Sequence, residues 1–148
     1  MITIEQYFGT KIHTLEQQRV AADLLEKVNA LCAEAEADGV VRQTCPNTGT
    51  MISGSKGGSG DGGFRLPDAT TGAKNSSHKV LPADNPAGAG VDVYAPGNHL
   101  DHWLNEFEEG DGKNSKLREY GLAREHPGST STWCHLTNRL IGRETFLP

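Results

Sequence analysis

A long amphipathic helix is expected near the N-terminus, and it limits the folds open to this chain because the other apolar segments are short. Thr14 is placed to cap this helix, and Gln17 stands at the third helical position, as a capping box requires. Apolar residues then recur at helical spacing, at Val20, Leu24, Val28, Leu31, Cys32 and Ala35. We therefore expect a helix over about 15–38, ended by Gly39. On its apolar face, Cys32 is expected to be a core residue rather than a nucleophile.

After this helix the pattern changes to short segments. Strands are expected at 40–44, 88–94 and 133–136, with 143–146 pairing with the last of these. Short helices are expected over about 98–107 and around Leu117 and Tyr120, the second ending at Gly121. This order predicts one α+β domain over 1–148, with a small, mainly antiparallel sheet and helices packed on it.

Composition excludes several classes of function. The 14 Lys+Arg and 19 Asp+Glu residues give a net charge of -5, whereas nucleic-acid binders usually carry a basic face. No apolar run approaches the roughly 20 residues that cross a bilayer, and the N-terminus lacks the pattern of a signal peptide. Three sparse cysteines suit reduced thiols better than a disulfide framework. We expect no nucleic-acid partner, no membrane insertion and synthesis in a cytoplasm.

A glycine-rich stretch over 53–63 invites comparison with a phosphate-binding loop. Gly49 and Gly54 have the required spacing, but Ser55-Lys56 reverses the order of residues that such a loop needs. A phosphate loop also requires a helix directly after it, and none is expected here. The stretch is interpreted as a loop over a site or as an insertion.

The best candidates for chemistry are two histidines and an aspartate. Asp92 stands in an otherwise apolar strand, where a carboxylate is costly unless it is paired or binds a metal. His135 also lies among apolar residues, and His78 follows a polar loop. Two imidazoles and a carboxylate leave the fourth tetrahedral position open for water, which is the pattern of a catalytic zinc site. The same residues also allow a buried Asp–His hydrogen bond beside an unrelated loop histidine.

The other histidines are weaker candidates. His99 and His102 stand three residues apart on the helix expected over 98–107, and such a pair can bind a metal, although exposed helical histidines are common. His13 and His126 lie in polar segments without a partner at an informative spacing.

Four short motifs carry the three candidate ligands and an arginine: GFR at 63–65, SSH at 76–78, GAGVDV at 88–93 and WCH at 133–135. Together they resemble the zinc peptidases of the M15 family, the D-Ala-D-Ala carboxypeptidases and phage L-alanyl-D-glutamate endopeptidases. The family signature reads approximately S-G-Y-R, then S-x-H-x-x-G-x-A-x-D, then a late His after Trp. The opening Tyr7-Phe8 and the tail 142–148 are similar to phage-encoded members. The resemblance covers most of the chain from about Phe64 onward.

This resemblance implies a fold, a metal and roles for particular residues. It implies an M15-type, hedgehog-like peptidase fold with Zn²⁺ held by the three candidate ligands. Arg65 matches the arginine that steadies the substrate carbonyl or carboxylate, because a guanidinium offers fixed paired donors. Ser76 matches the serine that shapes the ligand loop. Ser76 and Trp133 are expected to contact substrate together with Arg65.

The chain departs from the family pattern in two places. Fourteen positions separate His78 from Asp92, about twice the usual spacing, so an inserted loop is expected within 79–87. The family's general base is commonly a Glu three residues before the last His, and that position here is Thr132. A threonine takes no proton from water at neutral pH. Glu125 is the best substitute as a catalytic residue, the alternative being an ordinary surface glutamate.

The resemblance implies a zinc-dependent peptidase that cleaves peptidoglycan stem peptides, as a phage endolysin or virion-associated wall hydrolase. It would reside in the infected host's cytoplasm before release, or in the virion with other phage proteins. Loss of the usual Glu leaves an alternative, a catalytically degenerate M15-like structural or wall-binding protein. A third possibility is a structural domain without metal.

Overall fold

The computed structural model describes residues 1–55, 61–70, 72–130 and 132–147. Its helical elements are α1 (Ile4–Phe8), α2 (Leu15–Ala37), η1 (Ser77–Lys79), η2 (Pro96–Asn98), α3 (His99–Asn105), α4 (Ser115–Tyr120) and η3 (Pro127–Ser129). Its strands are β1 (Gly90–Tyr94), β2 (Glu108–Gly110), β3 (Lys113–Asn114), β4 (Ala123–Glu125), β5 (Trp133–Thr137) and β6 (Thr145–Phe146). The architecture is mixed α+β, as predicted. The glycine-rich loop expected at 53–63 falls partly on 56–60, outside the described residues.

The predicted long helix is present as α2, with the predicted capping box. The Thr14 hydroxyl accepts a hydrogen bond from the Gln17 amide at 3.0 Å, and the Gln17 side chain accepts one from the Thr14 amide at 2.8 Å. Gly39 follows the helix at φ +99°, a conformation that favours glycine. Cys32 is 2% exposed and belongs to the core, and burial raises the pKa of its thiol to about 11.

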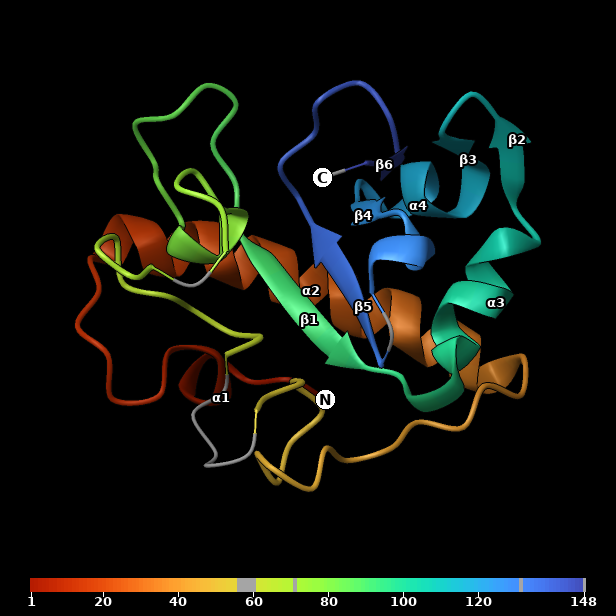
Figure 1. Ribbon diagram of the computed structural model, residues 1–148, viewed down its shortest axis with the longest axis horizontal. Helices are drawn as coiled ribbons and strands as arrows, with labels where there is room; N and C mark the ends of the chain where they lie inside the picture. The colour runs from red at the N-terminus through yellow and green to blue at the C-terminus, as the bar shows by residue number, and fades with distance from the viewer. Residues whose placement is uncertain (56–60, 71, 131, 148) are drawn as a thin grey trace.

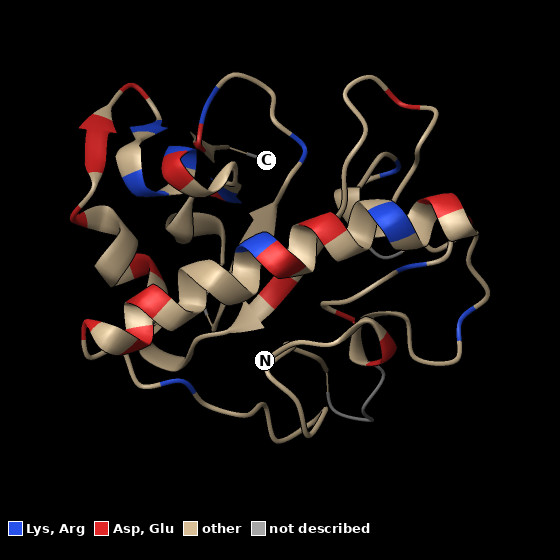
Figure 2. Cartoon of the chain, turned by 180° about the vertical axis from the view of Figure 1, so that it is seen from behind, with Lys and Arg blue, Asp and Glu red and all other residues tan. Residues whose placement is uncertain are grey.

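The main sheet has the strand order β1-β5-β4-β6 and lies against α2 (Figure 1). β5 pairs antiparallel with both β1 and β4, so three of the four strands form an antiparallel unit. One face of the β1–β5 pair carries apolar side chains that join α2 in the core, namely Val91, Val93, Cys134 and Leu136. Seen from behind, α2 crosses the back of the sheet, with charged residues on its outer side (Figure 2). The opposite face of the sheet is therefore left free for polar residues.

Two strand predictions are wrong. Residues 40–44 form no strand, because the Val40 amide bonds back to the Ala35 carbonyl at the end of α2 and Val41 is 69% exposed. The segment 143–146 does not pair with β5. Instead β6 pairs in parallel with β4, a strand that the sequence analysis did not predict and that takes the position beside β5.

A buried ion pair anchors β4. The Arg124 guanidinium and the Asp101 carboxylate are 1% and 0% exposed and approach to 2.9 Å. Arg124 also donates to Asn105 at 2.7 Å and to the Thr145 hydroxyl at 3.1 Å. One side chain thereby ties β4 to both α3 and β6. Removing either partner would leave a buried charge uncompensated, which is strongly destabilising.

Among the described residues, no helix is both long enough and apolar enough to span a membrane.

Candidate metal centre

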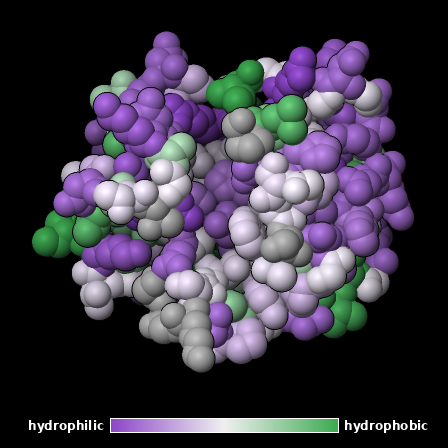
Figure 3. All heavy atoms as spheres, viewed as in Figure 1, coloured by the Kyte–Doolittle hydropathy of each residue, from purple (hydrophilic) through white to green (hydrophobic). Residues whose placement is uncertain are grey.

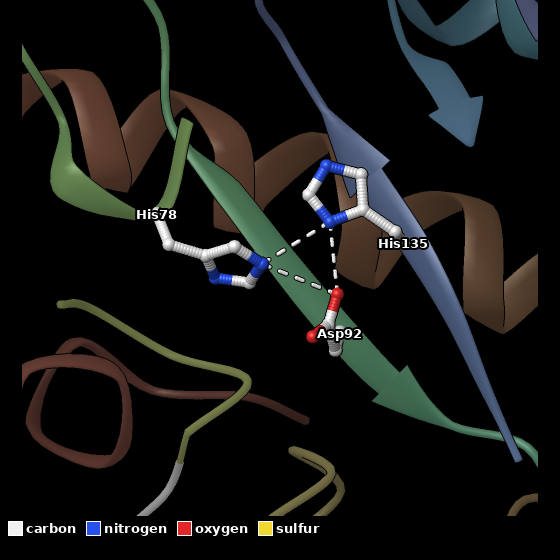
Figure 4. Close-up of side chains that lie close together, drawn as sticks. All are labelled: His78, Asp92 and His135. Atoms are coloured by element: carbon white, nitrogen blue, oxygen red, sulfur yellow. Dashed lines mark hydrogen bonds and ion pairs between the residues drawn. The ribbon is translucent and has the colours of Figure 1, made fainter. Parts of the chain in front are cut away.

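Strand pairing brings two of the predicted ligands together. In the antiparallel register of β1 and β5, Asp92 lies directly opposite His135, so their side chains emerge side by side on the same face. This is the face opposite the apolar one that packs with α2. His78 arrives from η1, which contacts β1. The three side chains come from three separate segments and meet above the sheet (Figure 4).

The three ligand atoms are close enough to hold one metal ion. The Asp92 Oδ1 atom lies 2.8 Å from His135 Nδ1 and 3.3 Å from His78 Nε2. The two ring nitrogens are 3.2 Å apart. Bonds of about 2.0–2.2 Å around a tetrahedral ion place ligand atoms about 3.3–3.6 Å apart. The distances from His78 Nε2 to the other two ligand atoms, 3.2 and 3.3 Å, are close to this range. The distance between Asp92 Oδ1 and His135 Nδ1 is shorter. The buried group His78, Asp92 and His135 could therefore hold a metal ion.

The outer nitrogens of the two rings are occupied by hydrogen bonds. His78 Nδ1 lies 2.9 Å from the Gly63 carbonyl, which can only accept, so the proton is on Nδ1 and the lone pair of Nε2 faces the centre. His135 Nε2 lies 3.3 Å from the Ser77 hydroxyl, which can accept its proton. In this tautomer both inward nitrogens are acceptors that face a carboxylate. Such a cluster of acceptors is stabilised by a cation between them.

Burial and charge favour the protonation states that bind a metal. All three residues are at most 8% exposed. Burial lowers the pKa of His78, although the nearby Asp92 carboxylate opposes that effect, so the ring favours its neutral form. Burial by itself raises the pKa of the Asp92 carboxyl, whereas a proton on the His78 and His135 ring nitrogens that face it outweighs burial and holds the pKa well below its ordinary value. A neutral imidazole and an ionised carboxylate are the forms that coordinate.

Two glycines leave the space that the centre occupies. A Cβ added at Gly90 would clash with the Ser77 hydroxyl and lie 2.9 Å from the His135 ring. A Cβ at Gly62 would lie 2.8 Å from the Cβ of Asp92. Close approach of the backbone to the ligands thus explains why GAGVDV carries a glycine two residues before Asp92.

Backbone and side-chain contacts hold the segment that carries His78. The Ser76 hydroxyl accepts a hydrogen bond from the His78 amide at 3.3 Å, and the Arg65 amide donates to the His78 carbonyl at 2.8 Å. Gln17 of α2 donates to the Val80 carbonyl at 3.1 Å. Val80 has a φ of +48°, unusual for a β-branched residue, and these contacts hold it there. The Ser76 hydroxyl thus caps the short helix that carries His78.

Arg139 fastens the same segment to the end of β5. Its Nε donates to the Pro86 carbonyl at 2.9 Å and its Nη1 to the Asn75 carbonyl at 2.7 Å. Its Nη2 forms an ion pair with Asp84 at 3.0 Å. One guanidinium therefore holds both sides of the loop that carries His78. Arg139 was not predicted from the sequence, because no local pattern distinguishes it.

Replacing Arg139 by Ala is expected to lower metal affinity by about 10- to 100-fold, the usual effect of losing a residue that orients a ligand. Competition with a chromophoric chelator measures the affinity. Arg19→Ala removes an equal charge from the exposed side of α2 and serves as the control. Equal metal affinity of Arg139→Ala and Arg19→Ala would show that the contacts of Arg139 do not orient His78.

A cleft of about 550 Å³ opens over the centre. In the space-filling view this face is hollowed, with hydrophilic residues within the hollow (Figure 3). The cleft is lined by every predicted site residue, namely Arg65, Ser76, His78, Asp92, Glu125, Trp133 and His135. The structure thus gathers residues spread over seventy positions of sequence around one opening, which suits a bound substrate.

Arg65 and Glu125 lie on two sides of the ligands. The Arg65 guanidinium is 3.8 Å from Asp92 Oδ2, and its Nε donates to the Asp61 carbonyl at 2.9 Å. The β4–β5 register that pairs Arg124 with Leu136 brings Glu125 opposite His135. Glu125, His135 and Asp92 therefore form one row across three strands, facing the same cleft.

Thr132 lies outside this arrangement. Its side chain is exposed, it is not among the residues that line the cleft, and its carbonyl accepts the Ala95 amide at 2.9 Å. His99 and His102 are likewise outside the metal group found among the described residues. The residues that orient the rings, Gly63 and Ser77, were not predicted, although the adjacent serines before His78 were a visible signal.

Comparisons of the chain with protein-family models, with curated proteins and with solved structures gave no significant match.

Proposed function

We propose that the chain is a zinc-dependent peptidase of the M15 type that cleaves peptidoglycan stem peptides. The observation that carries the proposal is the buried group of two imidazoles and one carboxylate at the floor of a cleft. Nitrogen and carboxylate ligands suit zinc, and three protein ligands leave a coordination position for water or substrate. Softer thiolate ligands are not involved, since the three cysteines lie elsewhere in the core.

Zinc held by His78, Asp92 and His135 would supply Lewis acidity to a carbonyl and lower the pKa of a water to about 7. Residues of the chain would transfer the proton and hold the peptide. Glu125 faces the cleft in the row next to His135 and can take a proton from the attacking water and pass it to the leaving amine. Arg65 faces the cleft on the Asp92 side and can hold a carbonyl or carboxylate of the peptide.

The choice of peptidoglycan comes from the motif resemblance, which points to peptides containing D-residues. The cleft agrees with a peptide ligand, because it combines polar groups with apolar walls at Trp133, Ile141 and Phe146. A phage endolysin or a virion-borne wall hydrolase is the context that we propose, with the wall peptide as the partner.

The test is hydrolysis of purified peptidoglycan, followed by the appearance of free amino groups. We expect zinc-dependent release that stops on chelation and returns when zinc is restored, together with about one zinc per chain by elemental analysis. Protein that contains zinc but releases nothing would contradict the proposal.

A second function is favoured by one observation, the threonine at position 132. If Glu125 does not act as the base, the chain would retain the metal site and the cleft but would bind wall peptides without cutting them. Zinc-dependent binding to peptidoglycan, with no release of amino groups, would identify this wall-binding function.

A further inference from the structure

The row of Asp92, His135 and Glu125 continues onto the last strand of the sheet, where Phe146 is the register partner of Glu125. Phe146 lines the cleft with the other three residues, so all four side chains point to the same side of the sheet. The centroid of the Phe146 ring lies 6.2 Å from that of His135, and the two ring planes are perpendicular. An aromatic ring thus stands beside a ligand of the candidate metal centre, at the end of the row opposite Asp92.

Two more apolar side chains line the same cleft. Trp133 precedes His135 by two residues on β5, so both point to the same face of the sheet. Ile141 belongs to the segment between β5 and β6 and is 57% exposed. A ligand that covers Ile141 would remove apolar surface from water, which favours binding.

The charged groups around the cleft limit which side chain suits these three apolar residues. Glu125 is the strand partner of Phe146 and the charged residue next to it in the row. Arg65 lies at the other end of the row, 3.8 Å from Asp92 Oδ2, and the Arg139 guanidinium is bound to the ligand-bearing loop. An acidic side chain beside Phe146 would be repelled by Glu125, and a basic one would occupy the carboxylate that takes the proton. An uncharged, apolar side chain avoids both effects.

We infer that Trp133, Ile141 and Phe146 form a subsite for a bulky apolar side chain of about the size of leucine. This side chain belongs to the residue whose carbonyl faces the metal centre, because Phe146 stands next to His135. Resting on the proposed function, the inference names the substrates as peptides that carry such a residue on the carbonyl side of the bond to be cut. Apolar pockets discriminate by size, since a missing methylene group costs roughly 10- to 200-fold.

Three hydroxamic acids without a stereocentre test the inference. The hydroxamate group chelates zinc and places each acyl chain at the centre. 4-Methylpentanehydroxamic acid has the carbon skeleton of leucine, propanehydroxamic acid has that of alanine, and succinic monohydroxamic acid replaces the two leucine methyl groups by carboxylate oxygens. Titration calorimetry on the zinc-loaded protein measures the three affinities. We expect the leucine-sized acid to bind about tenfold more tightly than the alanine-sized acid. The succinic compound should bind more weakly than the leucine-sized acid, because Glu125 repels its carboxylate.

Two variants assign the preference to the subsite. Ile141→Ala is expected to remove most of the preference, because it takes away part of the apolar wall. Leu140→Ala is the control and should keep it, since Leu140 is 51% exposed but is not among the residues that line the cleft.

Three results would each overturn the inference: equal affinity of the leucine-sized and alanine-sized acids, tighter binding of the succinic compound, or a preference that Ile141→Ala leaves unchanged. A zinc-loaded protein that binds none of the three acids would overturn it as well. The expected preference in a protein that releases no amino groups from peptidoglycan would refute the proposed hydrolysis and leave the subsite standing.

Discussion

Chelation is expected to lower the melting temperature of the wild-type protein by roughly 5–10 °C, and His135→Ala is expected to remove this dependence. A metal that binds only the folded chain at about 100 times its dissociation constant adds about 2.7 kcal/mol to the free energy of unfolding. In a protein of about 150 residues, each kcal/mol shifts the melting temperature by about 2–4 °C. Calorimetric scans with and without EDTA measure the effect.

His102→Ala is the matched control for this experiment, because it removes an exposed histidine that lies outside the metal group. It should keep the full response to EDTA. Identical wild-type melting curves in zinc and in EDTA would refute the metal centre. His78, Asp92 and His135 would then form a hydrogen-bonded cluster without a metal.

Replacing Glu125 by Gln is expected to lower the rate of peptidoglycan hydrolysis by about 10²–10⁴-fold, without changing zinc content. Glutamine keeps the shape of the side chain and can still orient a water, but it accepts no proton. General-base assistance contributes a factor of this size. The rate of amino-group release at saturating substrate, compared with elemental zinc analysis of the same samples, separates loss of catalysis from loss of metal.

Glu16→Gln, at an exposed position in the first turn of α2, is the control and should keep full activity. Full activity of zinc-loaded Glu125→Gln would show that another group acts as the base. Thr132→Glu should not replace Glu125, because the Thr132 side chain does not line the cleft. A gain of zinc-dependent activity from Thr132→Glu in an inactive parent would instead support the non-catalytic function.

Elements whose signals are local could be predicted from the amino-acid sequence. The capping box at Thr14 and the apolar spacing after it predict α2, since residues three and four apart share a helix face. Gly121 ends α4 in the left-handed conformation, as its position predicted. Asp92 was identifiable because an unpaired carboxylate in an apolar strand is costly, and that argument needs no knowledge of its neighbours.

The pairing of the strands and the set of residues that meet at the cleft could not be predicted from the sequence. β4 is three residues long and carries the buried Arg124, so no alternation marks it as a strand. It lies between β5 and β6, and this position brings Glu125 into the row of His135 and Asp92. Strand pairing depends on contacts between residues distant in sequence, which no single segment encodes. The contacts of Gly63, Ser77 and Arg139 with the ligand-bearing segments arise in the same way.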